Sequence, residues 1–568
     1  MDHPELLADD DLYVPATRFD RADELDVLIN GWTRELTTAE VTDALQANQC
    51  PAGPVRSFTD LLADPHLAQR GFFVAAPHLG PDARMPGVPF ALDGRSPPFR
   101  PAPAPVAPRS PEPAAHRRAT GSSPAPGRAP APEPAPGPGA GPLAGIRVVE
   151  LSVAWAGPLA GRFLADLGAD VVKVEHPTSR GLSIVAGGAG GAGAPWHWGE
   201  IPPAGQRNGI FPDAVPGERW WNRMAWFNKM NRGKRSLCLD VKAPGGRAVF
   251  EALVARADVV VNNYSPRGAR SLGIDHPTLR ALNPNLVTVD LTGFGAVGPA
   301  AEQVSWGPIL DAASGFSAAT GYPDSGPYKQ GLALPDAVGG VHGAYAILAA
   351  LWERDRTGGP VHVDLSQLET MIGLAGELVL ETSLRGAPPP RRGARSPQLA
   401  PQGVYRCVGD DEWVTLTVAD DETWRALAGL VGAPLQQPGW ATTEGRLRDH
   451  DRIDAVLGDW LAPRTKHAAM AELQAAGVPA AAVMTNRDLV EDPHLRARGL
   501  MVTLEQADCT PREFPGFPLH FEEIAPDLRP TPALGAHNHE ILRELGWSDA
   551  AIARLAADDT IRDGPPTD

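Results

Sequence analysis

The sequence contains few cysteines and no long uninterrupted hydrophobic segment. Four cysteines occur among 568 residues, and their wide spacing forms no CxxC pair. This pattern provides neither a disulfide framework nor the paired ligands of a structural zinc site, so we expect no bound metal. No hydrophobic run approaches the roughly 20 residues that a membrane-spanning helix needs. The sequence therefore predicts a protein that does not act in a membrane.

Positive charge is also scarce. Lys and Arg total 51 against 68 Asp and Glu, which gives a formal net charge of −17. A field of this sign repels polyanions, so nucleic acid is not expected as a partner. The first residues, MDHPELLADDD, are acidic and lack the basic and apolar regions of a secretory signal. We therefore expect a cytoplasmic location.

Proline and glycine are abundant, with 60 residues of each. Fourteen of the prolines fall within residues 101–142, which have no hydrophobic periodicity. Such a segment cannot bury enough apolar surface to offset the entropy of ordering it. Residues 101–142 are therefore predicted to be a disordered linker, which separates residues 1–100 from the long region that follows.

Residues 1–100 resemble a later part of the same chain. An offset of 428 positions aligns DPHLAQRG at Asp64–Gly71 with DPHLRARG at Asp492–Gly499, and it also aligns Trp32 with Trp460. Agreement of this kind with a single gap indicates an internal duplication. Because residues 143–428 have no counterpart before Met1, we interpret residues 1–100 as a partial copy of the C-terminal region.

The region after the linker alternates strand patterns with helix patterns. This alternation predicts an α/β fold in which helices cover a parallel sheet, and ligands of such sheets bind beyond the carboxyl ends of the strands. Gly157 and Gly161 do not complete a GxGxxG motif, so a classical NAD site is not favoured. The β-branched runs typical of buried strands occur at 145–151, 170–175, 258–263 and 286–291.

Two further features of this region suggest chemistry. Residues 227–242 carry five basic side chains and one acidic one, which is a plausible seat for a phosphorylated ligand, although a solvated loop has the same composition. Asp336 stands where the apolar helix at 339–356 would begin. An Asp there usually caps free N–H groups, whereas a catalytic carboxylate would lie beside donors that stabilise an oxyanion.

Five motifs occur in a specific order along the chain. Together they resemble the family III CoA-transferases, which include the formyl-CoA, carnitine and bile-acid CoA-transferases and are related to the α-methylacyl-CoA racemases. The resemblance extends over about residues 143–557. The motifs are LAGIRVVELSVAWAGPLAGRFLADLGADVVKVE, NRGKRSLCLDVK, ADVVVNNYSPRGARSLGI, LNPNLVTVDLTGFGAVGP and LPDAVGGVHGAYAILAALWERDRTGGPVHVDLS.

The resemblance implies an architecture as well as a fold class. It implies an α/β fold with a Rossmann-like parallel sheet in a large domain, a smaller α+β domain and an interlocked homodimer. The large domain would begin at 143–394, the small domain would occupy 395–485, and 486–568 would return to the large domain and end in a C-terminal helix. Residues 1–100 would then be a partial copy of the small domain and C-terminal segment.

The resemblance also implies a reaction. Asp336 matches the catalytic aspartate, which favours catalysis over capping at this position. Its carboxylate would attack an acyl-CoA thioester to form an anhydride and then an aspartyl-CoA thioester, which passes CoA to a free carboxylic acid. No permanently bound cofactor is implied, since coenzyme A enters with the substrate. The positions that match CoA contacts are Ala154, Trp155, Ala156, Leu239, Lys242 and Asn263, with Lys234 and Arg235 as candidates for its phosphates.

Two alternatives accompany this interpretation. A racemase pairs the aspartate with a histidine, because inversion of an α-carbon needs an acid and a base, but VSWGP places Trp306 at that position. The other alternative is a catalytically inactive subunit of a CoA-transferase complex, since residues 1–100 contain no counterpart of Asp336. Trp155, His176 and Ser271 depart from the family pattern, which leaves the CoA phosphate contacts open.

Overall fold

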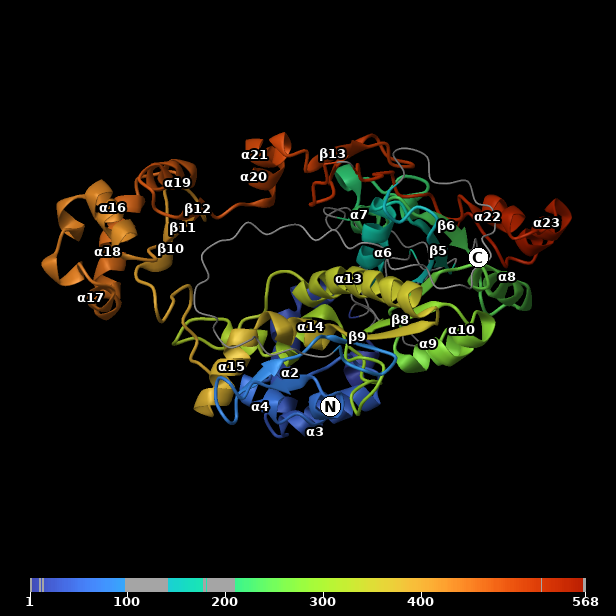
Figure 1. The fold of residues 1–568 in the computed structure, drawn as a ribbon, viewed down its shortest axis with the longest axis horizontal. Coiled ribbons are helices and arrows are strands. Elements are labelled where there is room, and N and C mark those ends of the chain that lie inside the picture. Colours follow the sequence, from blue (N-terminus) through green and yellow to red (C-terminus); the bar gives the residue numbers. More distant parts are fainter. Residues whose placement is uncertain are drawn as a thin grey trace. The chain divides into compact units, whose positions relative to one another are not determined.

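The computed structural model describes residues 3–9, 12, 15–97, 141–176, 180, 210–522 and 524–564, so nearly all of the predicted linker at 101–142 lies outside the described residues. The chain forms two compact units, and each is considered by itself (Figure 1). The larger unit comprises Met1–Ala318, Lys329–Pro389 and Val502–Asp568, and the smaller unit comprises Ala319–Tyr328 and Pro390–Met501.

A seven-stranded sheet forms the centre of the larger unit. Its order is β3-β9-β8-β7-β4-β5-β6, and all neighbours are parallel except β3 and β9. This parallel-rich sheet confirms the predicted α/β fold. The strands are β3 (Phe90–Leu92), β4 (Arg147–Leu151), β5 (Asp170–Glu175), β6 (Arg235–Cys238), β7 (Val259–Asn262), β8 (Val287–Thr292) and β9 (Val361–Ser366).

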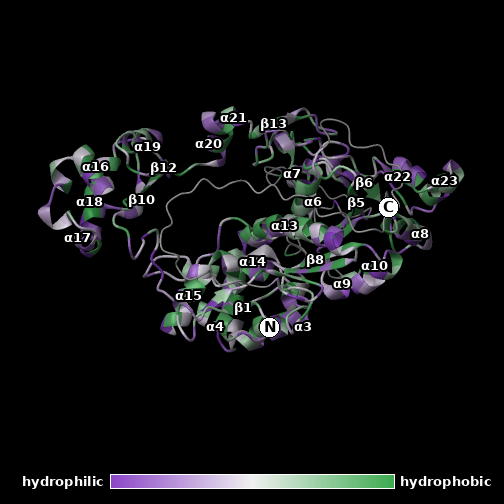
Figure 2. Cartoon of the chain, viewed as in Figure 1, coloured by the Kyte–Doolittle hydropathy of each residue, from purple (hydrophilic) through white to green (hydrophobic). Residues whose placement is uncertain are grey.

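Helices cover both faces of this sheet. Successive strand residues point to opposite faces, and both sets of side chains are mostly apolar and need to be buried. Val148 and Val171 belong to one core cluster and Val149 and Val172 to another. Figure 2 shows the hydrophobic residues along α13. The first cluster includes α6 (Ala156–Asp166) and α13 (Leu334–Thr357), and the second includes α8 (Pro244–Val254), α9 (Pro266–Leu272), α10 (His276–Leu282), α22 (Asn538–Glu544) and α23 (Asp549–Ala557).

Two glycines bring α13 unusually close to its neighbours. A Cβ atom on Gly340 would lie 2.8 Å from the carbonyl oxygen of Ala156, and one on Gly343 would lie 2.5 Å from Cδ1 of Leu291. Both distances are too short for a side chain in a close-packed interior. The glycines of the GGVHG segment therefore allow α13 to contact the first turn of α6.

Within the described residues, α13 alone is long and apolar enough to cross a membrane. This finding corrects the expectation that no segment approaches that length. The helix packs against α6 and β9 in the core of the larger unit, and a core helix of a soluble protein passes the same test. Its packing therefore accounts for its apolar composition.

Residues 15–92 pack against one edge of the sheet. They supply β3, in which Phe90 lies opposite Leu365 of β9. Phe58, Leu61 and Leu67 are buried. The elements of this segment are α1 (Pro15–Asp20), α2 (Ala22–Thr33), α3 (Thr38–Ala47), α4 (Phe58–Leu62), α5 (Pro65–Gln69), β1 (Phe73–Ala75) and β2 (Arg84–Pro86).

The smaller unit contains an antiparallel sheet, β10-β11-β12, covered by helices. It reaches Met501, beyond the expected boundary at 485, and so includes the segment around DPHLRARG. Its strands are β10 (Gln402–Arg406), β11 (Trp413–Thr417) and β12 (Ala480–Ala482), and its main helices are α16 (Asp421–Val431), α17 (Thr443–Arg448), α18 (His450–Leu461), α19 (Lys466–Ala475), α20 (Asn486–Glu491) and α21 (Pro493–Ala497).

Candidate active site

The turn from β4 to α6 lies where the strand order reverses. β5 and β6 lie on one side of β4, and β7, β8 and β9 lie on the other. Asn263, which follows β7, accepts a hydrogen bond from the Val153 amide at 2.9 Å and donates one to the Val153 carbonyl at 2.8 Å. Ala154 has a left-handed φ of 58°. Asn263 therefore holds a strained turn at the topological switch point, which is the usual ligand site of such sheets.

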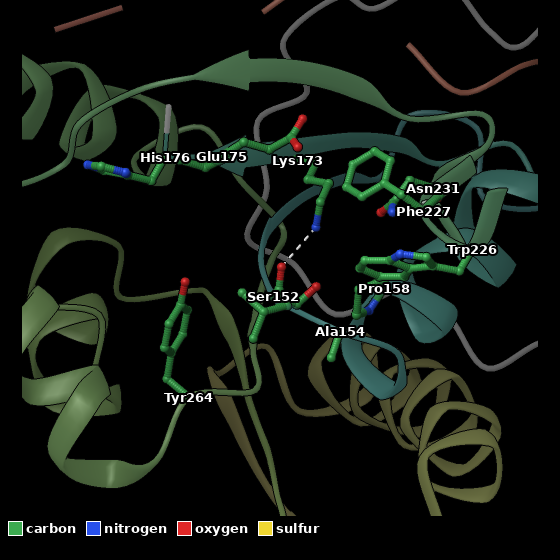
Figure 3. A pocket seen from close by; sticks show the side chains of 12 residues that line it. Ser152, Ala154, Pro158, Lys173, Glu175, His176, Trp226, Phe227, Asn231 and Tyr264 are labelled. Atoms are coloured by element: carbon green, nitrogen blue, oxygen red, sulfur yellow. Dashed lines mark hydrogen bonds between the residues drawn. The ribbon is translucent and has the colours of Figure 1, made fainter. Parts of the chain in front are cut away.

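A pocket opens beside this turn (Figure 3). Its lining comes from four segments that converge at the carboxyl ends of the strands. The wall combines aromatic side chains with polar and charged ones, so the pocket offers both apolar surface and hydrogen-bonding groups to a ligand. The lining residues are Ser152, Val153, Ala154 and Pro158 at the turn, Lys173 to His176 at the end of β5, Trp226, Phe227 and Asn231 from α7 (Ala225–Asn231), and Tyr264 after β7.

A buried ion cluster supports the turn from below. Glu150 is fully buried, and its carboxylate lies 2.9 Å from Nζ of Lys173 and 2.6 Å from Nζ of Lys234. Burial opposes ionisation of Glu150, but the two lysines together hold its pKa below the usual range. Lys173 also donates to the Ser152 carbonyl at 2.9 Å. A Cβ on Gly161 would lie 1.8 Å from Oε2 of Glu150. Glycine is therefore required at this position to make room for the buried carboxylate, and not to let a nucleotide approach the backbone.

Asp336 lies in the first turn of α13, but it does not cap the helix. The N-cap residue is Ala333, and no side chain caps this terminus. No described residue donates a hydrogen bond to the Asp336 carboxylate or forms an ion pair with it. Burial raises its pKa to about 6. A half-buried, unpaired carboxylate with a raised pKa is typical of a catalytic group, and the capping interpretation is wrong.

Two contacts place Asp336 near the turn. Gly340, one helical turn or about 6 Å further along α13, contacts Ala156 and Leu159 of α6. On another side, a Cβ on Gly307 would lie 2.3 Å from Oδ2 of Asp336. Gly307 begins α11 (Gly307–Ala313), directly after the N-cap residue Trp306. Glycine at this position therefore keeps the space around the carboxylate open.

The structure brings some of the predicted CoA contacts together at the turn. Ala154, Trp155, Ala156 and Asn263 all lie there, and Lys242 is exposed after the carboxyl end of β6. His176 directly follows β5 and interacts electrostatically with Asp240 and Lys242. These residues therefore form a continuous group along the carboxyl ends of β4, β5, β6 and β7.

Three other predicted contacts are elsewhere. Leu239 is fully buried in the core. Lys234 is buried beneath the turn, where its ammonium also donates to the Pro158 carbonyl at 2.8 Å. Arg235 lies at the amino end of β6, paired with Asp170, Glu540 and Glu544. The expectation that Lys234 and Arg235 contact CoA phosphates does not fit these positions, because one is enclosed and the other is at the opposite edge of the sheet.

Two residues of this site, Lys229 and Gly307, are not among the contacts that the sequence predicts. Lys229 lies with its Nζ 5.6 Å from the centroid of the Trp155 ring, and no described carboxylate pairs with it. Lys229 belongs to the same basic segment as Lys234. The sequence does not distinguish the two lysines, because their different surroundings follow from the position of Lys229 on α7. Gly307 follows Trp306, in a motif that bears on the racemase alternative only through the missing histidine. Among the described residues, no cluster of His, Cys, Asp or Glu is arranged to hold a metal ion.

Comparisons with known proteins identify the family of this chain. The family model described as "CoA-transferase family III" matches residues 1–107, 143–198 and 207–538. A succinate–glutarate CoA-transferase of Agrobacterium fabrum is 34% identical over 415 residues, which are 71% of this chain and 96% of that protein. A probable CoA-transferase of Mycobacterium tuberculosis is 30% identical over 577 residues, which are 99% of this chain and 67% of that protein.

Solved structures give the same result. The crystal structure of a CAIB/BAIF family protein from Brucella suis superposes with a TM-score of 0.61 at 32% identity, and the match covers 72% of this chain and all of that one. Curated relatives are named as enzymes that transfer CoA between acids. The chain therefore belongs to CoA-transferase family III and is a CoA-transferase.

Proposed function

We propose that the protein transfers CoA from an acyl-CoA to a free carboxylic acid through covalent catalysis by Asp336. The observation that carries this proposal is the unpaired Asp336 carboxylate, which lies one helical turn from the contact with the β4–α6 turn. Succinyl and glutaryl groups are the first acyl groups to test, because the Agrobacterium relative is named for succinate and glutarate.

The proposed steps need no metal and no net proton transfer. An Asp336 oxygen attacks the thioester carbonyl, the C–S bond breaks, and CoA leaves as a thiolate from a mixed anhydride. The thiolate then attacks the aspartyl carbonyl and displaces the donor acid as a carboxylate. The acceptor carboxylate attacks the resulting aspartyl-CoA thioester and the sequence reverses, which regenerates Asp336. The energy of the thioester bond is kept throughout.

We further propose that CoA binds along the pocket at the β4–α6 turn. Lys229 and Lys242 are the two lysines that support a contact with its phosphates, since both lie on the ligand side of the sheet and neither has a carboxylate partner among the described residues. A racemase is not supported, because the indole of Trp306 beside Gly307 cannot exchange a proton with an α-carbon.

The decisive test is a direct transfer assay. The purified protein, incubated with succinyl-CoA and glutarate, is expected to form glutaryl-CoA and succinate in equal amounts, as measured by liquid chromatography with mass spectrometry. Omitting glutarate is the control for hydrolysis. If glutarate gives no product, a panel of carboxylate acceptors follows, and failure of every acceptor with every acyl-CoA donor would contradict the proposed function.

The proposed reaction should depend on pH through Asp336. Burial raises the pKa of this carboxyl to about 6, and only the ionised form is a nucleophile. The value of kcat/KM is therefore expected to rise about tenfold per pH unit below 6 and to level off above about 7. A profile measured from pH 5 to 8.5 checks this, and a rate that stays constant down to pH 5 would argue against Asp336 as the titrating nucleophile.

A further inference from the structure

Gln367 carries a buried carboxamide without a hydrogen-bond partner among the described residues. The residue is 7% exposed, and its Oε1 atom accepts no hydrogen bond from any of them. No described residue accepts a hydrogen bond from its Nε2 atom either. Most buried polar side chains in proteins are paired, and an unpaired one beside a reactive group is therefore a candidate for contact with a substrate.

This carboxamide lies next to the turn of α13 that carries Asp336. Gln367 begins α14 (Gln367–Leu374), which packs beside α13 (Figure 1). A Cβ on Gly339 would lie 2.8 Å from Cγ of Gln367 and 3.3 Å from its Oε1. Gly339 is three residues after Asp336, and positions with this spacing on a helix are neighbours, with Cβ atoms about 5–6 Å apart. Gly339 therefore makes room for the carboxamide within one helical turn of Asp336.

A second series of contacts joins the start of α14 to the opposite side of Asp336. The Leu368 amide donates to the Gly293 carbonyl at 2.9 Å. A Cβ on Gly293 would lie 2.0 Å from Oγ of Ser305. Two residues further along, a Cβ on Gly307 would lie 2.3 Å from Oδ2 of Asp336. Two independent sets of contacts therefore place the carboxamide and the carboxylate at the same site.

The first turn of α14 is held firmly. Ser366 caps the helix by accepting a hydrogen bond from the Glu369 amide at 3.3 Å. The buried Glu369 carboxylate pairs with Arg70 at 2.5 Å, and Arg70 also pairs with Asp364 of β9 at 2.7 Å. These interactions fix the backbone on both sides of Gln367. The unpaired amide is thus held in place before a substrate binds, which is what stabilisation of a transition state requires.

From this placement we propose that Gln367 is a further catalytic residue of the transfer reaction proposed above. Its Nε2 atom donates a hydrogen bond to the carbonyl oxygen of the acyl group that Asp336 attacks. This oxygen gains negative charge as the Asp336 oxygen adds to the carbonyl carbon. It becomes a carbonyl oxygen again when the C–S bond breaks and CoA leaves as a thiolate. The amide keeps both of its protons throughout, so the step stays balanced.

A neutral amide fits this role better than a charged group. A cation beside Asp336 would lower the pKa of the carboxyl and weaken it as a nucleophile, whereas an amide leaves its ionisation unchanged. A donor fixed in a buried site also needs no reorganisation as the charge develops. A side chain that only filled the space beside Gly339 would be more stable if it were apolar, because an unpaired buried amide destabilises the fold.

Gln367→Met tests the proposal, because methionine has nearly the same size but cannot donate a hydrogen bond. The assay uses succinyl-CoA and glutarate, or the first pair of the panel that the parent protein converts. The kcat value is expected to fall about 100-fold, while KM for the acyl-CoA stays within about threefold. The pH dependence of kcat/KM should keep its midpoint near the Asp336 pKa of about 6, since the amide is not bonded to this carboxylate.

Stability measurements separate this role from a structural one. The denaturant midpoint of Gln367→Met should stay equal or increase, since the variant no longer buries an unpaired amide. Gln367→Leu is a second apolar variant and should behave in the same way. Thr382→Val is the control. Thr382 is a buried residue of α15 (Gly376–Arg385) that donates to the Leu378 carbonyl of its own helix at 2.6 Å, and its replacement should leave kcat within about twofold.

Three results would overturn the proposal. A kcat of Gln367→Met within about threefold of the parent value would mean that the amide does not contact the reacting oxygen. An increase in KM with unchanged kcat would mean that it contacts only the ground state. A lower denaturant midpoint together with a lower kcat, in both apolar variants, would indicate a structural role. Absence of transfer by the parent protein would instead contradict the proposed function itself, so the two failures are distinguishable.

Discussion

Replacing Asp336 by alanine is expected to reduce CoA transfer by at least about 1,000-fold, because the reaction then lacks its nucleophile. The fold should tolerate the change. No described residue hydrogen-bonds to this carboxylate, and its ionisation in the folded protein is unfavourable because burial raises its pKa to about 6. The free energy of unfolding at pH 8 should therefore stay equal or increase, since the folded state no longer holds a poorly solvated charge.

Asp355 provides a matched control on the same helix. Its side chain is 72% exposed at the other end of α13, so Asp355→Ala should leave transfer within about twofold of the parent. The covalent intermediate supplies a second readout. After incubation with acyl-CoA, the peptide that contains Asp336 should carry CoA or an acyl group that hydroxylamine removes. Full transfer by Asp336→Ala, or a label on another peptide, would refute the assignment.

Glu150→Gln is expected to cause the largest loss of stability, about 3–5 kcal/mol in the free energy of unfolding. The change leaves Lys173 and Lys234 without the carboxylate that compensates both of their buried charges. Burial lowers the pKa of Lys234 to about 7, so without Glu150 this lysine would lose its proton on folding. The unfolded state would then bind more protons, and the stability of the variant should increase from pH 6 to pH 9.

Chemical denaturation measures this loss, and Glu251→Gln is its control. Glu251 pairs with Arg247 at 2.8 Å on α8, but its side chain is 44% exposed, so its replacement should cost less than about 1 kcal/mol. Equal effects of the two substitutions would mean that burial does not strengthen the Glu150 cluster. Because Lys173 also holds the Ser152 carbonyl, Glu150→Gln should weaken acyl-CoA binding at temperatures where it remains folded.

Local patterns in the sequence were sufficient for much of the fold. The β-branched runs before Leu151, Glu175 and Asn263 correspond to β4, β5 and β7, because strands buried on both faces are mostly apolar. The order of motifs also led to the family and to Asp336. The breaks in GxGxxG predict that a dinucleotide site is absent, and the structure adds that Gly161 makes room for Glu150.

The roles of the basic residues depended on the tertiary structure. Three basic residues close in the sequence lie in different places. Lys229 lies beside the β4–α6 turn, Lys234 lies beneath this turn, and Arg235 lies at the opposite edge of the sheet. Sequence spacing cannot distinguish these positions, because β6 runs from the amino edge to the carboxyl edge of the sheet within four residues. Burial against Glu150 and pairing with Asp170 are interactions between distant segments.

The sequence by itself determined the fold class and the family, since both depend on local periodicity and ordered motifs, and the same motifs predict Asp336 as the nucleophile that we propose. Only the tertiary structure decided that Asp336 is unpaired rather than a helix cap, and that Gly307 keeps its surroundings open. These properties arise from contacts between residues far apart in the chain, where burial changes pKa values.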